Sequence, residues 1–560
     1  MVVFADAEQN KRIDSLKKRE EEELAQMLSH KYGVDYIDLS LVAVNADALR
    51  LLTEAEAHDA EAAVFGQVGK KVSLAARAPE NPKVKTLVAK LTERGFIPTV
   101  FMASQESLKR AYERYADLSY ATESKAGVFE LSDTELEELL GKVKGLSDIS
   151  ALITDAIQLK RTYRITRILE VILAGGLSTG ASDIHFEPEE AAIRLRYRLD
   201  GVLVDVLTFD HETYRLMLSR LKLLSGLKLN IVADAQDGRF SIKIRGDEIE
   251  LRTSILPGNY AETLVLRILN PKAIAVPLEE LGLEPTLRAR IEKEILKPTG
   301  MILTTGPTGS GKTTTLYAFM RTINSPGSKI ITIEDPIEYH LKGIVQTQVD
   351  KKNYTFAAGL RSALRQDPDI IMVGEIRDSE VAETAINAAL TGHLVFSTLH
   401  TNDAAGSFPR LIDLGVSEKV LSSSINVAMA QRLVRKLCPN CRVSRAPTED
   451  EQKIIDRYAK SIVDRSLVPP QTNTLYDAAP EGCAQCHGRG YKGRVGIFEA
   501  IFMDRSIEEV LRNKPSEREI ALVARAQGTP TMQEDGIIKI LRGITSLDEL
   551  QRVVDLAVFD

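Results

Sequence analysis

The sequence predicts an α/β chain built around a parallel sheet, with smaller mixed domains in front of it. From residue 285 onward, short apolar runs alternate with segments of helical length, which is typical of parallel strands covered by helices on both faces. A glycine-rich loop that joins one such run to the next helix indicates a phosphate-binding turn. At 560 residues the chain exceeds one hydrophobic core, so about three to four domains are expected.

The composition, 44% apolar and 27% charged, is that of an ordinary folded protein. A net charge of −7 gives no sign of the basic excess that nucleic-acid binding needs, so no nucleic-acid partner is expected. No apolar run approaches the roughly 18 residues of a membrane span, and the first residues lack a signal-peptide core. We therefore expect a cytoplasmic chain that reaches a membrane only through partners.

The region before the parallel sheet divides into three parts. Residues 1–115 carry no catalytic signature and begin with a charged helical pattern over Lys11–His30. Residues 116–160 are typical of a linker with one helix, started by a capping box at Ser132–Glu135. Residues 161–280 mix α and β patterns.

One predicted strand of that third part, Ile193–Leu199, alternates apolar residues with arginines. Because side chains alternate along a strand, one face carries three arginines: Arg194, Arg196 and Arg198. Asp200-Gly201 then predicts a hairpin turn. The arginines are either solvated side chains of a half-exposed strand or an edge that faces an anion.

The parallel sheet is predicted from four apolar runs: Met301–Thr305, Lys329–Ile333, Asp369–Val373 and Leu394–Ser397. The first run leads into a complete P-loop pattern: Gly306, Pro307, Thr308, Gly309, Ser310, Gly311, Lys312 and Thr313, with Thr314 opening the helix to Ile323. Glycines let backbone N–H groups surround the phosphates of ATP. Lys312 is expected on the β and γ phosphates, and the Thr313 hydroxyl on Mg²⁺.

Acidic residues follow two of the other strands, where ligands bind in parallel sheets. One strand ends in Gly374-Glu375, where an aspartate is usual, so Glu375 is expected near Mg²⁺ through water. The segment Glu334–Glu338 follows another strand, and one of these glutamates should orient or deprotonate the attacking water. His393 and His400 bracket the fourth strand and either sense the γ-phosphate or are structural.

Two C-x-x-C pairs supply all four cysteines: Cys438, Cys441, Cys483 and Cys486. With 41 residues between the pairs, four thiolates suit a closed tetrahedral Zn²⁺ site. A redox pair or unliganded thiols remain the alternatives.

Together these motifs resemble the secretion-motor ATPases of the PilT/GspE superfamily over about residues 160–555. The matching segments, in chain order, are Ala181–Pro188, Ala235–Arg239, Gly306–Thr314 (Walker A), Thr332–Glu338 (Asp box), Leu364–Asp378 (Walker B) and Thr391–Asn402 (His box). The resemblance implies Glu338 as the catalytic glutamate and Glu375 as the Walker B acid. It also implies nucleotide-contacting arginines at Arg196, Arg198 and Arg267.

The resemblance further implies a fold: a PAS-like α+β domain at 161–280 and a RecA-like ATPase domain at 285–560, with a zinc-binding insertion at 437–490. Residues 1–115 resemble a small N-terminal α/β docking domain, called N1, that contacts an inner-membrane accessory complex. Some N1 domains bind cyclic di-GMP through an Arg-Leu-Gly element, which this sequence lacks.

The implied function is that of a homo-hexameric motor acting on an inner-membrane platform protein of the PilC/GspF kind. Zinc and chain length favour an assembly motor of the PilB or GspE kind over the shorter retraction motor PilT. The long N-terminal region then favours type IV pilus assembly, as in PilB. The alternatives are a type II secretion ATPase of the GspE kind, a nucleotide-gated scaffold that hydrolyses little, and a DNA-uptake or conjugation motor.

Overall fold

The structure of this chain is a computed structural model. It describes residues 20–39, 42, 44, 46–49, 51–68, 70–115, 128–130, 139, 141–143, 145–158, 161–244, 247–270, 275–350, 353–470 and 473–556. The described residues fall into two compact units, one up to residue 125 together with 151–171, the other 126–150 together with 172–560. Among them, no helix is both long and apolar enough to cross a bilayer. The predicted capping box at Ser132–Glu135 lies outside the described residues.

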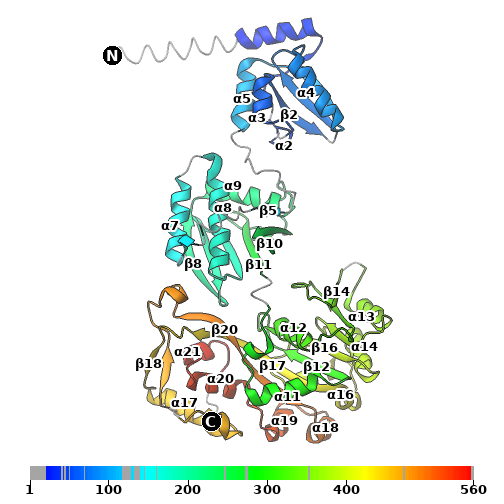
Figure 1. Ribbon diagram of the computed structural model, residues 1–560, viewed down its shortest axis with the longest axis vertical. Coiled ribbons are helices and arrows are strands. Elements are labelled where there is room, and N and C mark those ends of the chain that lie inside the picture. The colour runs from blue at the N-terminus through cyan, green and yellow to red at the C-terminus, as the bar shows by residue number, and fades with distance from the viewer. Residues whose placement is uncertain are drawn as a thin grey trace. The chain divides into compact units, whose positions relative to one another are not determined.

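The first unit contains a four-stranded sheet in the order β1-β4-β3-β2 (Figure 1). Its elements are helical residues 20–32, β1 (Asp35–Tyr36), α2 (Ala46–Leu49), α3 (Glu54–Asp59), β2 (Ala62–Val68), β3 (Lys71–Ala76), α4 (Pro82–Glu93), β4 (Ile97–Met102) and α5 (Gln105–Tyr115). Alternate residues enter different apolar clusters: Phe65 and Ala75 join α5, whereas Val64 and Leu74 join α4. The two faces of this sheet are therefore covered by different helices.

A seven-stranded sheet follows, in the order β5-β9-β10-β11-β6-β7-β8. The elements of this part are β5 (Val128–Glu130), α7 (Leu146–Ile157), α8 (Arg161–Ser178), β6 (Asp183–Pro188), β7 (Ile193–Leu199), β8 (Val202–Phe209), α9 (His211–Leu224), β9 (Gln236–Ile244), β10 (Asp247–Leu256) and β11 (Thr263–Leu269). The predicted strand Ile193–Leu199 and its hairpin are confirmed, because β7 has these bounds and Asp200 and Gly201 have φ of 50° and 87°. Positive φ at both positions is what a two-residue hairpin requires.

The largest part of the chain is built around a second seven-stranded sheet (Figure 1). Its strand order is β14-β13-β15-β16-β12-β17-β20. Its strands are β12 (Gly300–Thr305), β13 (Ile330–Glu334), β14 (Val345–Gln348), β15 (Ile370–Val373), β16 (Leu394–Leu399), β17 (Ile425–Leu437) and β20 (Tyr491–Phe502). Neighbouring strands are parallel except that β20 is antiparallel to β17.

Helices surround this sheet and complete the fold. They are η1 (Leu278–Glu280), α11 (Pro285–Ile295), α12 (Lys312–Ile323), α13 (Phe356–Leu364), α14 (Ser379–Leu390), α15 (Ser407–Asp413), α16 (Glu418–Ser424), α17 (Glu449–Ser461), η2 (Arg465–Leu467), η3 (Ala484–Cys486), α18 (Arg505–Leu511), α19 (Glu517–Ala524), η4 (Arg525–Gln527), α20 (Met532–Leu541) and α21 (Leu547–Gln551). A small sheet pairs β18 (Val443–Arg445) with β19 (Leu475–Asp477).

The strands of this sheet are apolar throughout because both faces are buried. Ile302 and Phe396 belong to the cluster that includes α11 and α12. Their neighbours Leu303 and Val395 belong to the other cluster, with α13 and α14. The predicted α/β class and its parallel strands are thereby confirmed.

Candidate active site

The P-loop lies between the last residue of β12 and the first turn of α12, as the sequence predicts. Three of its residues, Gly306, Gly309 and Gly311, have φ of 142°, 80° and 93°. Side chains rarely allow such values, which explains the glycines. Gly311 is the N-cap of α12, so the N-terminal end of this helix, with its partial positive charge, points into the loop.

Lys312 is the half-buried cation of this loop. Its Nζ donates hydrogen bonds to the carbonyl oxygens of Gly306, at 2.7 Å, and Pro307, at 3.2 Å. Burial lowers the pKa of Lys312, the carboxylate of Glu375 acts against this, and Arg432 adds to the lowering. The ammonium group is thus held over the loop by neutral carbonyls, which a phosphate would replace with stronger, charge-assisted bonds.

Glu375 follows β15, and the fold brings it to the same edge of the sheet as the P-loop. Its side chain is 12% exposed and forms ion pairs with Arg377, at 2.5 Å, and with His400, at 3.2 Å. Thr401, directly after His400, is within 2.7 Å of the Thr305 hydroxyl at the end of β12. Residues from three neighbouring parallel strands therefore meet at one point, as the predicted strand order requires.

The structure separates the two candidate histidines. His400 follows β16 and lies at the P-loop edge, whereas His393 precedes β16, whose Leu394 pairs with Gly300 at the beginning of β12. The Nδ1 atom of His393 is 3.0 Å from the Ala388 carbonyl oxygen in the last turn of α14. The fold thus does not bring His393 to the P-loop, and its contacts are those of a structural residue.

The acidic segment at the end of β13 holds one buried and one half-buried glutamate. Glu334 is 2% exposed and accepts hydrogen bonds from Thr332, Tyr317 and, at 3.1 Å, the Gln346 side chain. Burial raises its pKa, and these three donors act against that. Glu338 lies in the following loop, near enough for its charge to raise the pKa of Glu334. Glu334 is therefore engaged within the fold, whereas Glu338 is partly exposed.

The sequence analysis did not predict the partners of Glu334, because Tyr317 comes from α12 and Gln346 from β14, and only Thr332 lies on the same strand. It also missed Gln431 on β17, whose Nε2 donates to the Ser310 carbonyl oxygen at 2.7 Å. Gln431 is 1% exposed and lies under the P-loop. Its only sequence signal is a polar residue directly after the apolar run Val427–Ala430.

The three candidate arginines lie on the other seven-stranded sheet, each paired with an acid of β6. Arg196 is 2.5 Å from Glu187. Arg198 and Arg267 share Asp183, at 3.4 Å and 2.9 Å. The predicted common face of β7 is confirmed by its alternating burial. Within the described residues, no hydrogen bond or ion pair joins these arginines to the P-loop.

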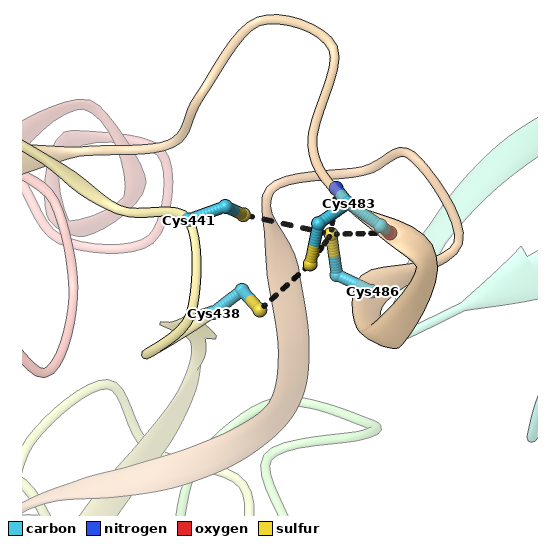
Figure 2. A group of neighbouring side chains, drawn as sticks. All are labelled: Cys438, Cys441, Cys483 and Cys486. Atoms are coloured by element: carbon cyan, nitrogen blue, oxygen red, sulfur yellow. Dashed lines mark hydrogen bonds between the residues drawn. The ribbon is translucent and has the colours of Figure 1, made fainter.

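The four cysteines converge, as Figure 2 shows. Their ligand atoms all lie within 4.8 Å of one another, in a group composed of Cys438, Cys441, Cys483 and Cys486. Nearest sulfur pairs are 3.7 Å and 3.8 Å apart, too far for a disulfide. Four sulfurs bound to one zinc at about 2.3 Å would form a tetrahedron with edges of about 3.8 Å.

The protonation of one of these thiols also suits a metal, whereas burial and the neighbouring thiols raise the pKa of Cys441 to about 12. Cys486 is buried, which by itself raises a thiol pKa, but the backbone N–H groups of Cys483 and Gly490 donate to its sulfur at 3.1 Å and 3.2 Å. Together with the neighbouring thiols they lower the pKa of Cys486 to about 6. The donor set therefore fits a metal that binds thiolates.

Comparison with known proteins agrees with this geometry. Residues 158–552 match the family described as "Type II/IV secretion system protein", and residues 32–122 match the MshEN domain. The chain is 42% identical to the type II secretion system protein E of Pseudomonas aeruginosa over 450 residues, 79% of this chain and 85% of that one. It is 36% identical to the type IV pilus assembly ATPase PilB of Myxococcus xanthus over 537 residues, 95% of this chain and 91% of that one.

The fold is also similar to a solved structure, the ATPase DotB of Legionella pneumophila. The TM-score is 0.50 at 23% identity, over 70% of this chain and 95% of DotB. This likeness concerns the fold of the core. The predicted family resemblance is confirmed, and this chain belongs to the type II/IV secretion system protein family.

Proposed function

We propose that this chain is the ATP-hydrolysing motor of type IV pilus assembly. The observation that carries the proposal is the meeting of Lys312, Glu375 and His400 at the carboxyl edge of one parallel sheet, next to a complete P-loop. Family membership and this loop make the chain an ATPase that uses a nucleotide and Mg²⁺.

The residues of the site divide the work of hydrolysis. Lys312 leaves the loop carbonyls to bind the β and γ phosphates, and the Thr313 hydroxyl and Glu375 hold Mg²⁺, which neutralises phosphate charge when bound. Glu338 accepts the proton of the attacking water. His400, positioned by its contact with Glu375, senses whether the γ-phosphate is bound. Arg196, Arg198 and Arg267 act on a nucleotide held between subunits of a hexameric ring.

The chain's remaining parts have supporting roles in this proposal. The four cysteines hold one structural Zn²⁺, which ties two distant segments of the ATPase domain at 285–560 together. The docking domain at 1–115 contacts an inner-membrane accessory complex. The PAS-like domain at 161–280 works with the ATPase domain on an inner-membrane platform protein. The motor is cytoplasmic and peripheral at that membrane.

A type II secretion ATPase is the second candidate. Alignment over 95% of this chain with the pilus ATPase of M. xanthus supports pilus assembly, whereas the higher identity, 42%, to the P. aeruginosa protein supports secretion. The test is a deletion strain complemented with the wild-type chain or with Lys312→Ala. Loss of surface pili with normal exoprotein secretion supports the first function, and the reverse result supports the second.

The ATPase itself is tested separately, by steady-state turnover of the purified full-length chain with Mg²⁺ and ATP. A chain that binds ATP tightly but turns over less than one molecule per assembly would be a nucleotide-gated scaffold.

A further inference from the structure

Arg432 lies against the first residue of the P-loop. Thr305 at the end of β12 pairs with Ala430 of β17, so the next residues of β17 lie level with the loop. Gln431 occupies the space beneath it, and a Cβ added to Gly306 would lie 3.0 Å from Arg432 Nη1. The guanidinium is therefore a near neighbour of the loop backbone, and it comes from β17, the strand on the other side of β12 from β16.

The guanidinium of Arg432 has only neutral partners. Nη1 donates to its neighbour's carbonyl oxygen, Gln431 O, at 3.0 Å, and Nη2 donates to Asn402 O at 2.9 Å. Within the described part of the chain, no carboxylate lies within ion-pair distance of it. Arg435, three residues along the same strand, pairs with Glu549 at 2.6 Å. The acids whose charges act on Arg432, Glu499 and Asp403, lie beyond ion-pair distance. A negative ligand in contact with the guanidinium would therefore still stabilise this half-buried cation.

Two cations share this small region. Burial lowers the pKa of Arg432, and the charges of Glu499 and Asp403 act against this. Burial also lowers the pKa of Lys312, to which Arg432 contributes by repulsion. Glu375 is the acid that acts against this on Lys312. The chain of phosphates in a nucleoside triphosphate carries enough negative charge to satisfy both groups.

We propose that Arg432 is a ligand of the phosphate chain of the nucleotide, supplied by the same subunit as Lys312. The inference rests on the proposed ATPase function and adds a phosphate contact to the P-loop set. Arginine suits this place, because its planar fork can bind a phosphate oxygen with one nitrogen while the other stays on Asn402. Since Asn402 is two residues after His400, Arg432 joins the bound phosphate to the segment that carries His400.

Two substitutions separate this role from a structural one. In Arg432→Gln the amide still donates a hydrogen bond to a carbonyl, but the charge is lost. Arg432→Lys keeps the charge and loses the fork. Lys436→Gln removes one positive charge from an exposed position of the same strand and serves as the matched control. Each full-length variant is titrated with a fluorescent non-hydrolysable ATP analogue, and inorganic tripolyphosphate is used as the competitor.

Arg432→Gln should weaken the binding of the analogue and of tripolyphosphate by the same factor, about tenfold or more. The melting temperature should not change. Arg432→Lys should recover part of the affinity, and Lys436→Gln should bind as the wild type does. Unchanged analogue affinity in Arg432→Gln overturns the proposal, and so does a loss for the analogue without a loss for tripolyphosphate. Lys312→Ala is measured in parallel: if it also binds and hydrolyses ATP normally, the P-loop is not the nucleotide site and the proposed site itself has failed.

Discussion

The Nε2 atom of His400 lies 3.2 Å from the Oε2 atom of Glu375, although 25 positions separate the two residues in the chain. Each follows a strand, and these strands, β15 and β16, are parallel neighbours. The contact thus joins Glu375, the proposed Walker B acid, directly to the predicted His box. Loss of a γ-phosphate next to His400 would change the environment of Glu375 as well.

Lys312→Ala should reduce ATP turnover by roughly 100-fold or more, because the variant loses the cation that stabilises phosphate charge in the transition state. The fold should remain intact, since the hydrogen bonds of Lys312 within the described residues go to carbonyl oxygens of its own loop. Turnover and thermal unfolding of the purified full-length chain test both statements. Near-normal hydrolysis in this variant would contradict the proposed nucleotide site.

Glu338→Gln should still bind ATP but lose the chemical step, because an amide cannot accept the proton of the attacking water. Single-turnover kinetics separate the two effects. Glu383→Gln, at an exposed position of α14, is the control and should be fully active.

Glu375→Gln should shift the Mg²⁺ concentration needed for half-maximal turnover to higher values, since a carboxylate is a better partner for Mg²⁺ than an amide. The measurement is a Mg²⁺ titration of turnover at saturating ATP. If this variant is inactive at every Mg²⁺ concentration while Glu338→Gln hydrolyses normally, the general base lies after β15 and not after β13.

One zinc per chain is expected in elemental analysis of the purified protein. Cys483→Ser should lower the melting temperature, because metal binding contributes directly to folding at such sites. The control is a strong chelator, which should lower the melting temperature of the wild type to that of the variant. A metal-free chain with four titratable thiols would end this prediction.

Arg198→Ala should reduce turnover strongly with a small loss of nucleotide affinity, as expected for a residue that acts on the departing phosphate. The matched control is Arg194→Ala, on the same face of β7, where the arginine pairs with the exposed Asp205 at 2.6 Å. Equal losses in both variants would mean that the arginines of this face act only through the stability of the sheet.

The thermal stability of the ATPase domain should fall as the pH rises from about 5 to 8, in part because of Glu517. A hydrogen bond with Asp403, together with burial, raises the pKa of Glu517 from 4.5 to about 7. The folded chain then binds more protons than the unfolded chain between these values, so this contribution is present at low pH and is lost as Glu517 ionises beside Asp403. In Glu517→Gln the fall should be smaller. The melting temperatures of both proteins at pH 5 and pH 8 test the sign.

The sequence predicted those parts of the site that depend on neighbouring residues. The P-loop, β7 with its hairpin and the four cysteines are each a local pattern. His393 and His400 looked equivalent because both flank one strand, yet a parallel sheet places the two ends of that strand at opposite edges. Only the residue after the strand lies where ligands bind.

The remaining features depend on pairings that are distant in the sequence. Gln431 and Arg432 reach the P-loop because β17 pairs with β12, more than a hundred residues earlier. Asp183 neutralises Arg267 across 84 positions, because β11 lies beside β6. Apolar runs indicate strands, but they do not tell which strands become neighbours.

The strand β17 runs without interruption from Gln431 under the P-loop to Leu437, and Cys438 follows at once. Its partner β20 begins at Tyr491, opposite Leu437 and five residues after Cys486. A zinc ion on the cysteines would link the ends of β17 and β20 that lie farthest from the P-loop. At 3.3 Å per residue, this end of β17 is about 20 Å from Gln431. Because an extended strand is nearly at its full length, a force applied at the zinc site would be transmitted along β17 to the nucleotide site.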